Sequence, residues 1–192
     1  SYSSLGVFAQ DGMNLLKDKL DLNLGVRYDY INITGEKTFN PEYEIVNGNL
    51  NNNPTGQQII WNDVKSNNSS FSSNLGLKYS LSPMINITIG FAYSFRSPSL
   101  EERFQFIDQG SLVRIGNPNL KPEEGKSADF GFSLYADNLK IITSIYYNYF
   151  NNLVSEVRGT FEGRNATFKT NIGEARIYGF DLSSEYNFIN DY

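Results

Sequence analysis

The sequence predicts an all-β protein: an antiparallel up-and-down transmembrane β-barrel, of which this chain forms a part with about seven or eight strands. Three observations lead to this fold class. Apolar and polar residues alternate over repeated stretches of about 10 to 12 residues, close to the length with which a tilted strand crosses a bilayer. Short and long connections alternate between these stretches, and aromatic residues gather at their ends.

The clearest strand covers residues 20–31. Its even-numbered residues from Leu20 to Tyr30 are aliphatic or tyrosine, whereas its odd-numbered residues from Asp21 to Asp29 are polar or glycine. Successive side chains of a strand point to opposite faces, so this strand has one apolar and one polar face. The same alternation predicts strands over residues 71–81, 85–95, 126–136, 139–149 and 176–188, and residues 4–10 are predicted as a further strand.

The polar faces of these strands are small and hydrophilic, which suits a wet or plugged lumen better than a dry protein core. The residues concerned include Asp21, Asn23, Ser72, Asn74, Asn86, Thr88, Ser94, Asp129 and Ser133. Arg27 and Lys78 lie on the same faces, and we expect them to pair with Asp21, Asp29 or Asp129.

The connections differ in length at the two ends of the strands. Long outer loops are predicted at about residues 32–70, 96–123 and 151–165, and tight turns at Leu81–Met84, at Ala136–Asn138 and at residues 190–192. Short periplasmic turns and long extracellular loops are typical of outer-membrane barrels. Two aromatic girdles follow the same division, with Tyr28, Tyr30, Tyr93, Phe95, Tyr147 and Tyr149 at the long-loop ends and Tyr79, Tyr186 and Phe188 at the short-turn ends.

Composition excludes several function classes. The 192 residues include neither cysteine nor histidine, so thiolate chemistry and the commonest general base and metal ligand are missing; we predict no enzyme activity, no cofactor and no metal site. The net charge of −5 and the lack of basic runs argue against nucleic acid. The first ten residues do not resemble a signal peptide, so we expect the chain to begin inside something longer or to be a trimmed piece.

One stretch interrupts the alternation. After Phe95 the sequence reads "RSPSLEERF" and then "GNPNLKPEEG", with prolines at 98, 118 and 122. Proline lacks an N–H donor and restricts the residue before it to extended conformations, so the segment cannot simply continue a sheet. Local physics therefore predicts a stiffened loop that ends one strand and leads into the next at about Glu123.

This stretch resembles the barrel signature of TonB-dependent outer-membrane receptors. The resemblance lies on Arg96, Pro98, Leu100, Glu102, Asn117, Pro118, Leu120, Lys121, Pro122 and Glu123. A second stretch, "TNIGEARIYGFDLSSEY", is similar to another family pattern through Asn171, Ala175, Ile177, Gly179 and Asp181. Residues 6–30 resemble the family's strand-turn-strand that precedes a long loop, so the similarity covers nearly the whole chain apart from the loops.

The resemblance implies a monomeric barrel of about 22 strands with a plugged lumen. Such a receptor sits in the outer membrane of a Gram-negative bacterium, contacts its lipid and imports a scarce nutrient with energy passed through TonB. An iron–siderophore complex is the expected ligand, with haem or cobalamin as alternatives. This chain holds no plug, so the parent protein would reach TonB through a plug that lies elsewhere.

The weak candidates for ligand contact lie in the predicted outer loops: Tyr43, Trp61, Arg96, Glu101, Glu102, Arg103 and Arg114. Each has a plainer interpretation. The charges around Arg96 favour a salt-bridge cluster at the root of a loop, and the proline motif with Gly179 is expected to be architectural. "EYEIVNGNL" and "QQIIWNDV" around Tyr43 and Trp61 are predicted to form a hairpin turned by Asn47-Gly48.

Three other functions remain open on the residues alone. A passive porin or adhesin barrel would share the alternation but lack the proline signatures. A soluble β-sandwich binding module would also use aromatics, although its strands are usually shorter. An outer-membrane hydrolase would need a base that this chain does not contain.

Overall fold

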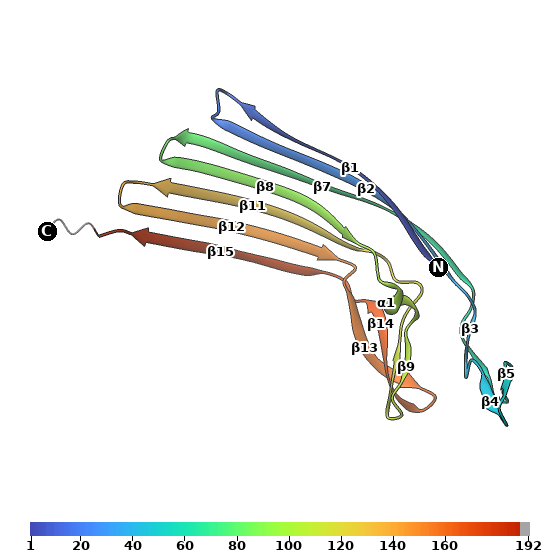
Figure 1. Cartoon of the computed structure of the whole chain (residues 1–192). Helices are drawn as coiled ribbons and strands as arrows, with labels where there is room; N and C mark the ends of the chain where they lie inside the picture. The colour runs from blue at the N-terminus through green and yellow to red at the C-terminus, as the bar shows by residue number, and fades with distance from the viewer. Residues whose placement is uncertain (189–192) are drawn as a thin grey trace.

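The computed structural model describes residues 1–188, and its main feature is a curved antiparallel sheet of seven strands (Figure 1). The strands follow one another in the order β1-β2-β7-β8-β11-β12-β15, each pairing with its neighbour in the up-and-down manner predicted. Their bounds are β1 Tyr2–Leu15, β2 Leu20–Gly35, β7 Val64–Ser82, β8 Ile85–Arg96, β11 Glu123–Tyr135, β12 Leu139–Asn151 and β15 Ala175–Tyr186. The sheet is an open section of a barrel wall, which confirms the predicted fold class.

Tight turns join the strands at one end of the sheet. Leu16, Lys17 and Asp18 take positive φ between β1 and β2, and Pro83-Met84 and residues 136–138 form the next two turns. Both of the latter were expected from the sequence. The turn predicted at residues 190–192 lies outside the described residues.

Three strands extend further than the sequence predicts: β1, which covers Tyr2–Leu15 rather than residues 4–10, and the pair β2 and β7. β2 and β7 are 16 and 19 residues long and stay paired as far as Gly35 and Val64, so the connection between them runs from 36 to 63 rather than from 32 to 70. Ile31 and Ile33 are buried, although they lie on the face that carries Asp21 and Asp29. Beyond the membrane region the polarity of the two faces therefore reverses, and the pattern on which the prediction depends no longer applies.

The outer connections carry a second sheet, which we call the loop sheet. Its order is β13-β14-β10-β9, with bounds Val154–Phe161, Arg164–Asn171, Leu112–Ile115 and Phe106–Asp108. β9 and β10 belong to the connection after β8, whereas β13 and β14 form a hairpin in the connection after β12, which was expected as a plain loop at 151–165. β10 and β14 pair in parallel and join the two connections.

The loop sheet has its own small core. Val113, Ile115 and Ala166 are buried there, and Trp61 from the connection after β2 packs against them. Phe106, Phe161 and Phe168 complete the cluster. All three long connections therefore contribute to one packed body at this end of the sheet.

The connection after β2 forms two short two-stranded sheets, and the strands of the second lie between those of the first in the sequence. β3 (Thr38–Asn40) pairs with β6 (Gln58–Trp61), and β4 (Glu44–Val46) pairs with β5 (Asn49–Asn51). Asn47 and Gly48 have φ of 51° and 79°, as a two-residue hairpin turn with both central residues left-handed requires. The turn is confirmed, but the predicted pairing of the two segments is wrong, because "QQIIW" pairs with β3 and the segment around Ile45 pairs with β5.

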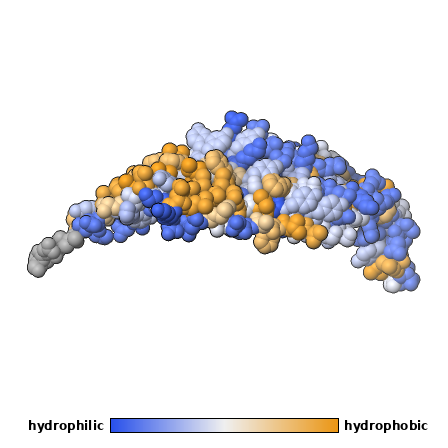
Figure 2. Space-filling model, turned by 90° about the horizontal axis from the view of Figure 1, so that it is seen from above, coloured by the Kyte–Doolittle hydropathy of each residue, from blue (hydrophilic) through white to orange (hydrophobic). Residues whose placement is uncertain are grey.

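The two faces of the seven-stranded sheet differ in polarity. Large apolar side chains on one face remain exposed in this chain, for example Phe91 at 51%, Ile145 at 56% and Phe180 at 61%. The register places Phe91 in the row next to that of Ile145 and Phe180, with all three on this face. Figure 2 shows the resulting apolar surface over the turn end and middle of the sheet, giving way to polar surface toward the loops. This is the face that the sequence pattern predicts to contact lipid.

Glycines on the opposite, inner face make room for neighbouring side chains. A Cβ built at Gly179 would collide with the ring of Tyr146, its cross-strand partner, and one at Gly131 would collide with the hydroxyl of Thr88. Gly76 differs, because its Cβ would meet only Asn23 Cβ at an ordinary 3.8 Å. The inner glycines thus set how closely large side chains can lie against the wall.

None of the helices in residues 1–188 combines the length and the hydrophobicity needed to cross a membrane.

Candidate functional site

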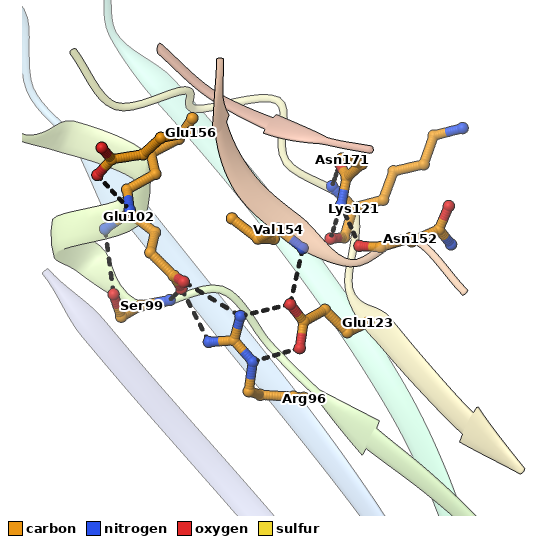
Figure 3. Close-up of polar contacts among 10 residues, drawn as sticks. Arg96, Ser99, Glu102, Lys121, Glu123, Asn152, Val154, Glu156 and Asn171 are labelled. Carbon is orange, nitrogen blue, oxygen red and sulfur yellow. Dashed lines mark hydrogen bonds and ion pairs between the residues drawn. The ribbon is translucent and has the colours of Figure 1, made fainter. Parts of the chain in front are cut away.

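The proline stretch folds into a hydrogen-bonded cluster where β8 leaves the sheet and β11 enters it (Figure 3). Arg96, the last residue of β8, lies directly opposite Glu123, the first residue of β11. Its Nε and Nη2 donate to the two carboxylate oxygens of Glu123 at 2.6 and 2.7 Å. Nη1 and Nη2 also donate to Glu102 at 3.0 and 3.1 Å. One guanidinium therefore joins two strands and the loop between them, as the planar fork of arginine allows.

Glu102 is held in place by a short helix, α1 (Leu100–Phe104). Ser99 is its N-cap: the Ser99 Oγ accepts from the Glu102 N–H at 3.1 Å, and the Glu102 carboxylate accepts from the Ser99 N–H at 2.8 Å. This reciprocal capping box satisfies two free backbone donors of the helix. The preceding Pro98 is fully buried. The spacing Ser99-x-x-Glu102 is a sequence signal for this helix that our reading of the sequence missed.

The electrostatics of Glu102 follow from these contacts. Partial burial disfavours its charged form, but hydrogen bonds from Arg96 and from the Ser99 N–H outweigh this and hold the pKa of the Glu102 carboxyl below its usual range. Lys169 and Glu156 form an ion pair with 2.9 Å between their charged atoms, and Glu156 lies near Glu102 in Figure 3. Lys169 adds to the lowering of the Glu102 pKa. Glu102 is therefore an ionised structural partner at neutral pH.

Arg103 is directed into the protein. Its side chain is 1% exposed, and Nη1 donates to the Pro118 carbonyl oxygen at 2.7 Å. Its Nε and Nη2 have no hydrogen-bond partner within residues 1–188. Burial lowers the pKa of the guanidinium, since desolvation disfavours the charged form. Arg103 thus connects α1 to the second half of the proline stretch and does not face the solvent.

Backbone contacts complete this connection. The N–H of Asn117 donates to the Glu102 carbonyl at 3.0 Å, and that of Gly116 donates to the Gln105 carbonyl at 2.8 Å. A side chain at Gly116 would collide with the backbone of Arg103, so this close approach requires glycine. Leu120 is buried at 3% exposure.

The two stretches that resemble family patterns contact each other through Asn171. Its Oδ1 accepts from the Lys121 N–H at 2.9 Å, and its Nδ2 donates to the carbonyls of Lys121 and Asn152 at 3.0 and 2.6 Å. Glu123 adds a further link by accepting from the Val154 N–H at 2.7 Å. The side chains of Asn171 and Glu123 therefore join the root of the β8–β11 connection to both ends of the β13–β14 hairpin (Figure 3).

The side chains of the other predicted contact residues take no part in this hydrogen-bonded cluster. Tyr43 precedes β4 and is 53% exposed, Glu101 is exposed on α1, and Arg114 is exposed on β10. Trp61 packs against the core of the loop sheet. The structure thus brings together Arg96, Glu102 and Arg103, and it places the remaining candidates on separate parts of the outer loops.

The inner face holds paired charges, as expected from the sequence. Arg27 donates to both oxygens of Asp29 at 2.7 and 2.6 Å, and Lys78 lies 3.7 Å from Asp21. A shallow hollow of about 420 Å³ adjoins Arg27. No group of acidic side chains within residues 1–188 is arranged to hold a metal ion. Chemically, the inner face offers paired charges, and the loop end of the sheet offers a packed surface for binding.

Comparison with known proteins gives a consistent picture. The sequence model of the family "TonB dependent receptor-like, beta-barrel" matches residues 1–192. Among curated relatives, the chain is 25% identical over 207 residues to the heme/hemopexin utilization protein C of Haemophilus influenzae, covering 96% of this chain and 25% of that protein. It is 23% identical over 128 residues to the vitamin B12 transporter BtuB of Vibrio cholerae, covering 67% of this chain and 19% of the relative. The chain thus spans about a quarter of these relatives or less.

Solved structures share the fold. The hemophore receptor HasR of Serratia marcescens superposes with a TM-score of 0.71 at 16% identity, over 97% of this chain and 32% of that one. The copper transporter OprC superposes with a TM-score of 0.69 at 20% identity, over 98% and 27%.

Proposed function

The chain belongs to the TonB-dependent receptor family, whose members are β-barrel proteins of the Gram-negative outer membrane, and on this premise we propose that it forms part of the wall and outer loops of a receptor that imports a scarce iron-containing nutrient. The observation that carries the proposal is the family match over all 192 residues. The packed outer loops support it, because a receptor requires an ordered binding surface on the side from which the nutrient arrives.

Two classes of nutrient fit this proposal. A ferric siderophore is the ligand that the sequence resemblance favours. Haem is the second candidate, since two relatives, at 25% and 28% identity, are named for heme utilization and as a heme receptor. In either case the nutrient is cargo, and the chain's own role is to bind and guide it.

The exposed loop residues are the proposed contacts. Tyr43 and Arg114 offer an aromatic surface and a cation, and an anionic ferric complex or the propionates of haem would be attracted to a cation. Glu101 is exposed beside the hydrogen-bonded cluster of Arg96, Glu102 and Glu123. We assign Arg96, Glu102, Arg103 and Trp61 to holding this surface in shape, because their side chains are committed to contacts within the chain.

The proposed activity is transport without enzyme chemistry. This chain offers neither a histidine nor a thiol that could activate a nucleophile or a water molecule. The energy would come from TonB, which would act on a plug supplied by another part of the parent protein.

Growth on defined iron sources tests the proposal. A strain that lacks the parent protein is compared with the same strain carrying the full-length gene, under iron limitation, on a panel of ferric siderophores, on haemin and, separately, with limiting cobalamin. We expect growth on one iron source to need the parent protein and to need TonB, the latter measured in a strain that lacks TonB. Dependence for cobalamin alone would overturn the iron proposal, and unchanged growth on every source would overturn nutrient import.

A further inference from the structure

The connection after β2 contains a small exposed hairpin of residues 44–51, which we call the outer hairpin. Figure 1 shows it apart from the loop sheet. Three residue pairs join its strands β4 and β5, and the central pair, Ile45 with Leu50, is 67% and 62% exposed. A two-stranded sheet without a covering layer is marginally stable in water. The outer hairpin is therefore expected to open far more readily than the seven-stranded sheet.

The turn of the outer hairpin is the only Asn-Gly pair among the 192 residues. Asn47 and Gly48 are both exposed, with φ of 51° and 79°. A Cβ built at Gly48 would meet nothing within 4 Å, so no other part of the chain crowds this glycine. Within residues 1–188, the hydrogen bonds outside the β4–β5 pairing involve neither residue. They support the hairpin at its base, where Gln57 donates to the carbonyls of Pro41 and Asn52 at 3.0 and 3.2 Å.

An asparagine that precedes glycine can lose its side-chain amide without an enzyme. The backbone nitrogen of the glycine loses its proton and attacks Cγ of the asparagine, so an N–Cγ bond forms, the Cγ–Nδ2 bond breaks and ammonia leaves. Water then opens the resulting five-membered ring at either of its two carbonyls, which gives aspartate or isoaspartate. In isoaspartate the backbone runs through the side chain and is longer by one carbon. Glycine favours the ring closure because it carries no Cβ beside the attacking nitrogen and adopts backbone conformations that other residues avoid.

Other asparagines of the chain are held more firmly than Asn47. Asn68, which precedes Ser69, lies in β7 and pairs with Ile31 of β2 in the seven-stranded sheet. Its backbone must leave this sheet before a ring can close, and strands of a large sheet open at a free-energy cost that approaches that of global unfolding. Asn165 lies in β14, which is paired on both sides, with β10 and with β13. The structure therefore favours reaction at the turn of the outer hairpin.

We propose that Asn47 is a site of spontaneous deamidation, through attack by the Gly48 nitrogen, and that the reaction unpairs β4 from β5. A two-residue hairpin turn requires two left-handed residues, and the additional backbone carbon of isoaspartate changes this geometry. The new carboxylate also adds to Glu42 and Glu44 in a segment, residues 41–57, that contains no cation. Like charges destabilise a paired sheet, so the hairpin does not re-form as before. The modification is independent of nutrient import, because it needs only water.

Timed peptide mapping of the folded full-length parent protein tests the proposal. The protein is incubated in mildly alkaline buffer, and aspartate and isoaspartate at each asparagine are counted by mass spectrometry. A second sample is unfolded beforehand and kept in urea, which shows the rate that the local sequence alone gives. We expect Asn47 of the folded protein to react within about tenfold of its rate in urea, and Asn68 to fall behind its own urea rate by far more. Equal protection of the two sites, or an unchanged Asn47 in the folded protein, would overturn the proposal.

A matched variant tests the structural consequence. Asn47→Gly has no side-chain amide, and glycine keeps the left-handed turn, so its outer hairpin should stay paired through the same incubation. Amide hydrogen exchange in β4 and β5, measured by rapid mixing, should become faster in the incubated parent protein and stay unchanged in Asn47→Gly. Exchange that stays unchanged in parent protein with a converted Asn47 would overturn the unpairing of the hairpin. Equally faster exchange in Asn47→Gly would show that the incubation, and not Asn47, is the cause.

Discussion

Gly179 on β15 lies directly opposite Tyr146 on β12, and its replacement by alanine tests how the inner face of the wall is packed. A Cβ at Gly179 would collide with the Tyr146 hydroxyl and come within 2.5 and 2.8 Å of Cζ and Cε1 of the ring. Contacts this short force the ring to move. Overpacking of this kind costs about 1 to 3 kcal/mol.

A matched control separates this collision from the general effect of alanine. Gly76→Ala also adds a methyl group on the inner face, but there the new carbon meets only Asn23 Cβ at 3.8 Å. Alanine in a strand is favoured over glycine by roughly 0.5 to 1 kcal/mol, so Gly76→Ala should be neutral or stabilising. We expect Gly179→Ala to be less stable than Gly76→Ala by about 1 to 3 kcal/mol.

The assay is urea unfolding of the full-length parent protein in lipid vesicles, followed by heat-dependent gel mobility. The double variant Gly179→Ala with Tyr146→Ser removes the ring that collides and should recover most of the loss. Equal unfolding midpoints for the two alanine variants would refute the packing argument. A loss at Gly179 that Tyr146→Ser leaves unchanged would refute the assignment to Tyr146.

Three further predictions concern the outer loops. Asn171→Ala removes three hydrogen bonds and should cost about 1.5 to 4.5 kcal/mol of local stability, seen as faster amide exchange at Lys121. Asn165→Ala on the same strand should leave exchange at Lys121 unchanged. Folding lowers the pKa of Glu102, so the contacts of its ionised carboxylate stabilise α1 at a pH above the ordinary carboxyl pKa and are lost as the pH falls through the lowered pKa. Protease cleavage of residues 97–122 should therefore rise in acid. Glu102→Gln should flatten that rise. Val113→Ala empties part of the loop-sheet core and should cost about 1 to 3 kcal/mol, measured by amide hydrogen exchange in β10 and β14. Amide protection equal to that of the parent protein would contradict the assignment of Val113 to this core.

The seven strands of the main sheet can be predicted from the sequence because a membrane strand shows both of its environments in its residue pattern. Lipid on one side and water on the other impose a period of two that continues for the whole crossing. The same reasoning fails at Ile31 and Ile33, where the pattern keeps its period but exchanges its faces above the membrane. The ends of β2 and β7 are therefore missed, although their central parts are predicted.

The loop sheet has no comparable local signal. β9 and β10 are three and four residues long, and the pairing of Leu112 with Asn165 spans more than fifty residues, so no short window of sequence contains both partners. The candidate site can likewise be predicted from the sequence only in part. The charges of Arg96, Glu101, Glu102 and Arg103 predict an ion-pair cluster, and the structure forms its Arg96–Glu102 pair. Glu123 joins this pair instead of Glu101, and the burial of Arg103 depends on a contact with the Pro118 carbonyl that residue type alone does not indicate.

The parallel pairing of β10 with β14 has a consequence for how the outer surface of this protein can diversify. Two connections that are separate in the gene share one set of backbone hydrogen bonds and one core, formed by Val113, Ile115 and Ala166. Exchange of either segment alone, by recombination or by grafting from a relative, leaves the other with an unpaired edge and an incompatible core. Residues 97–122 and 152–174 should therefore be inherited, and engineered, as a single cassette.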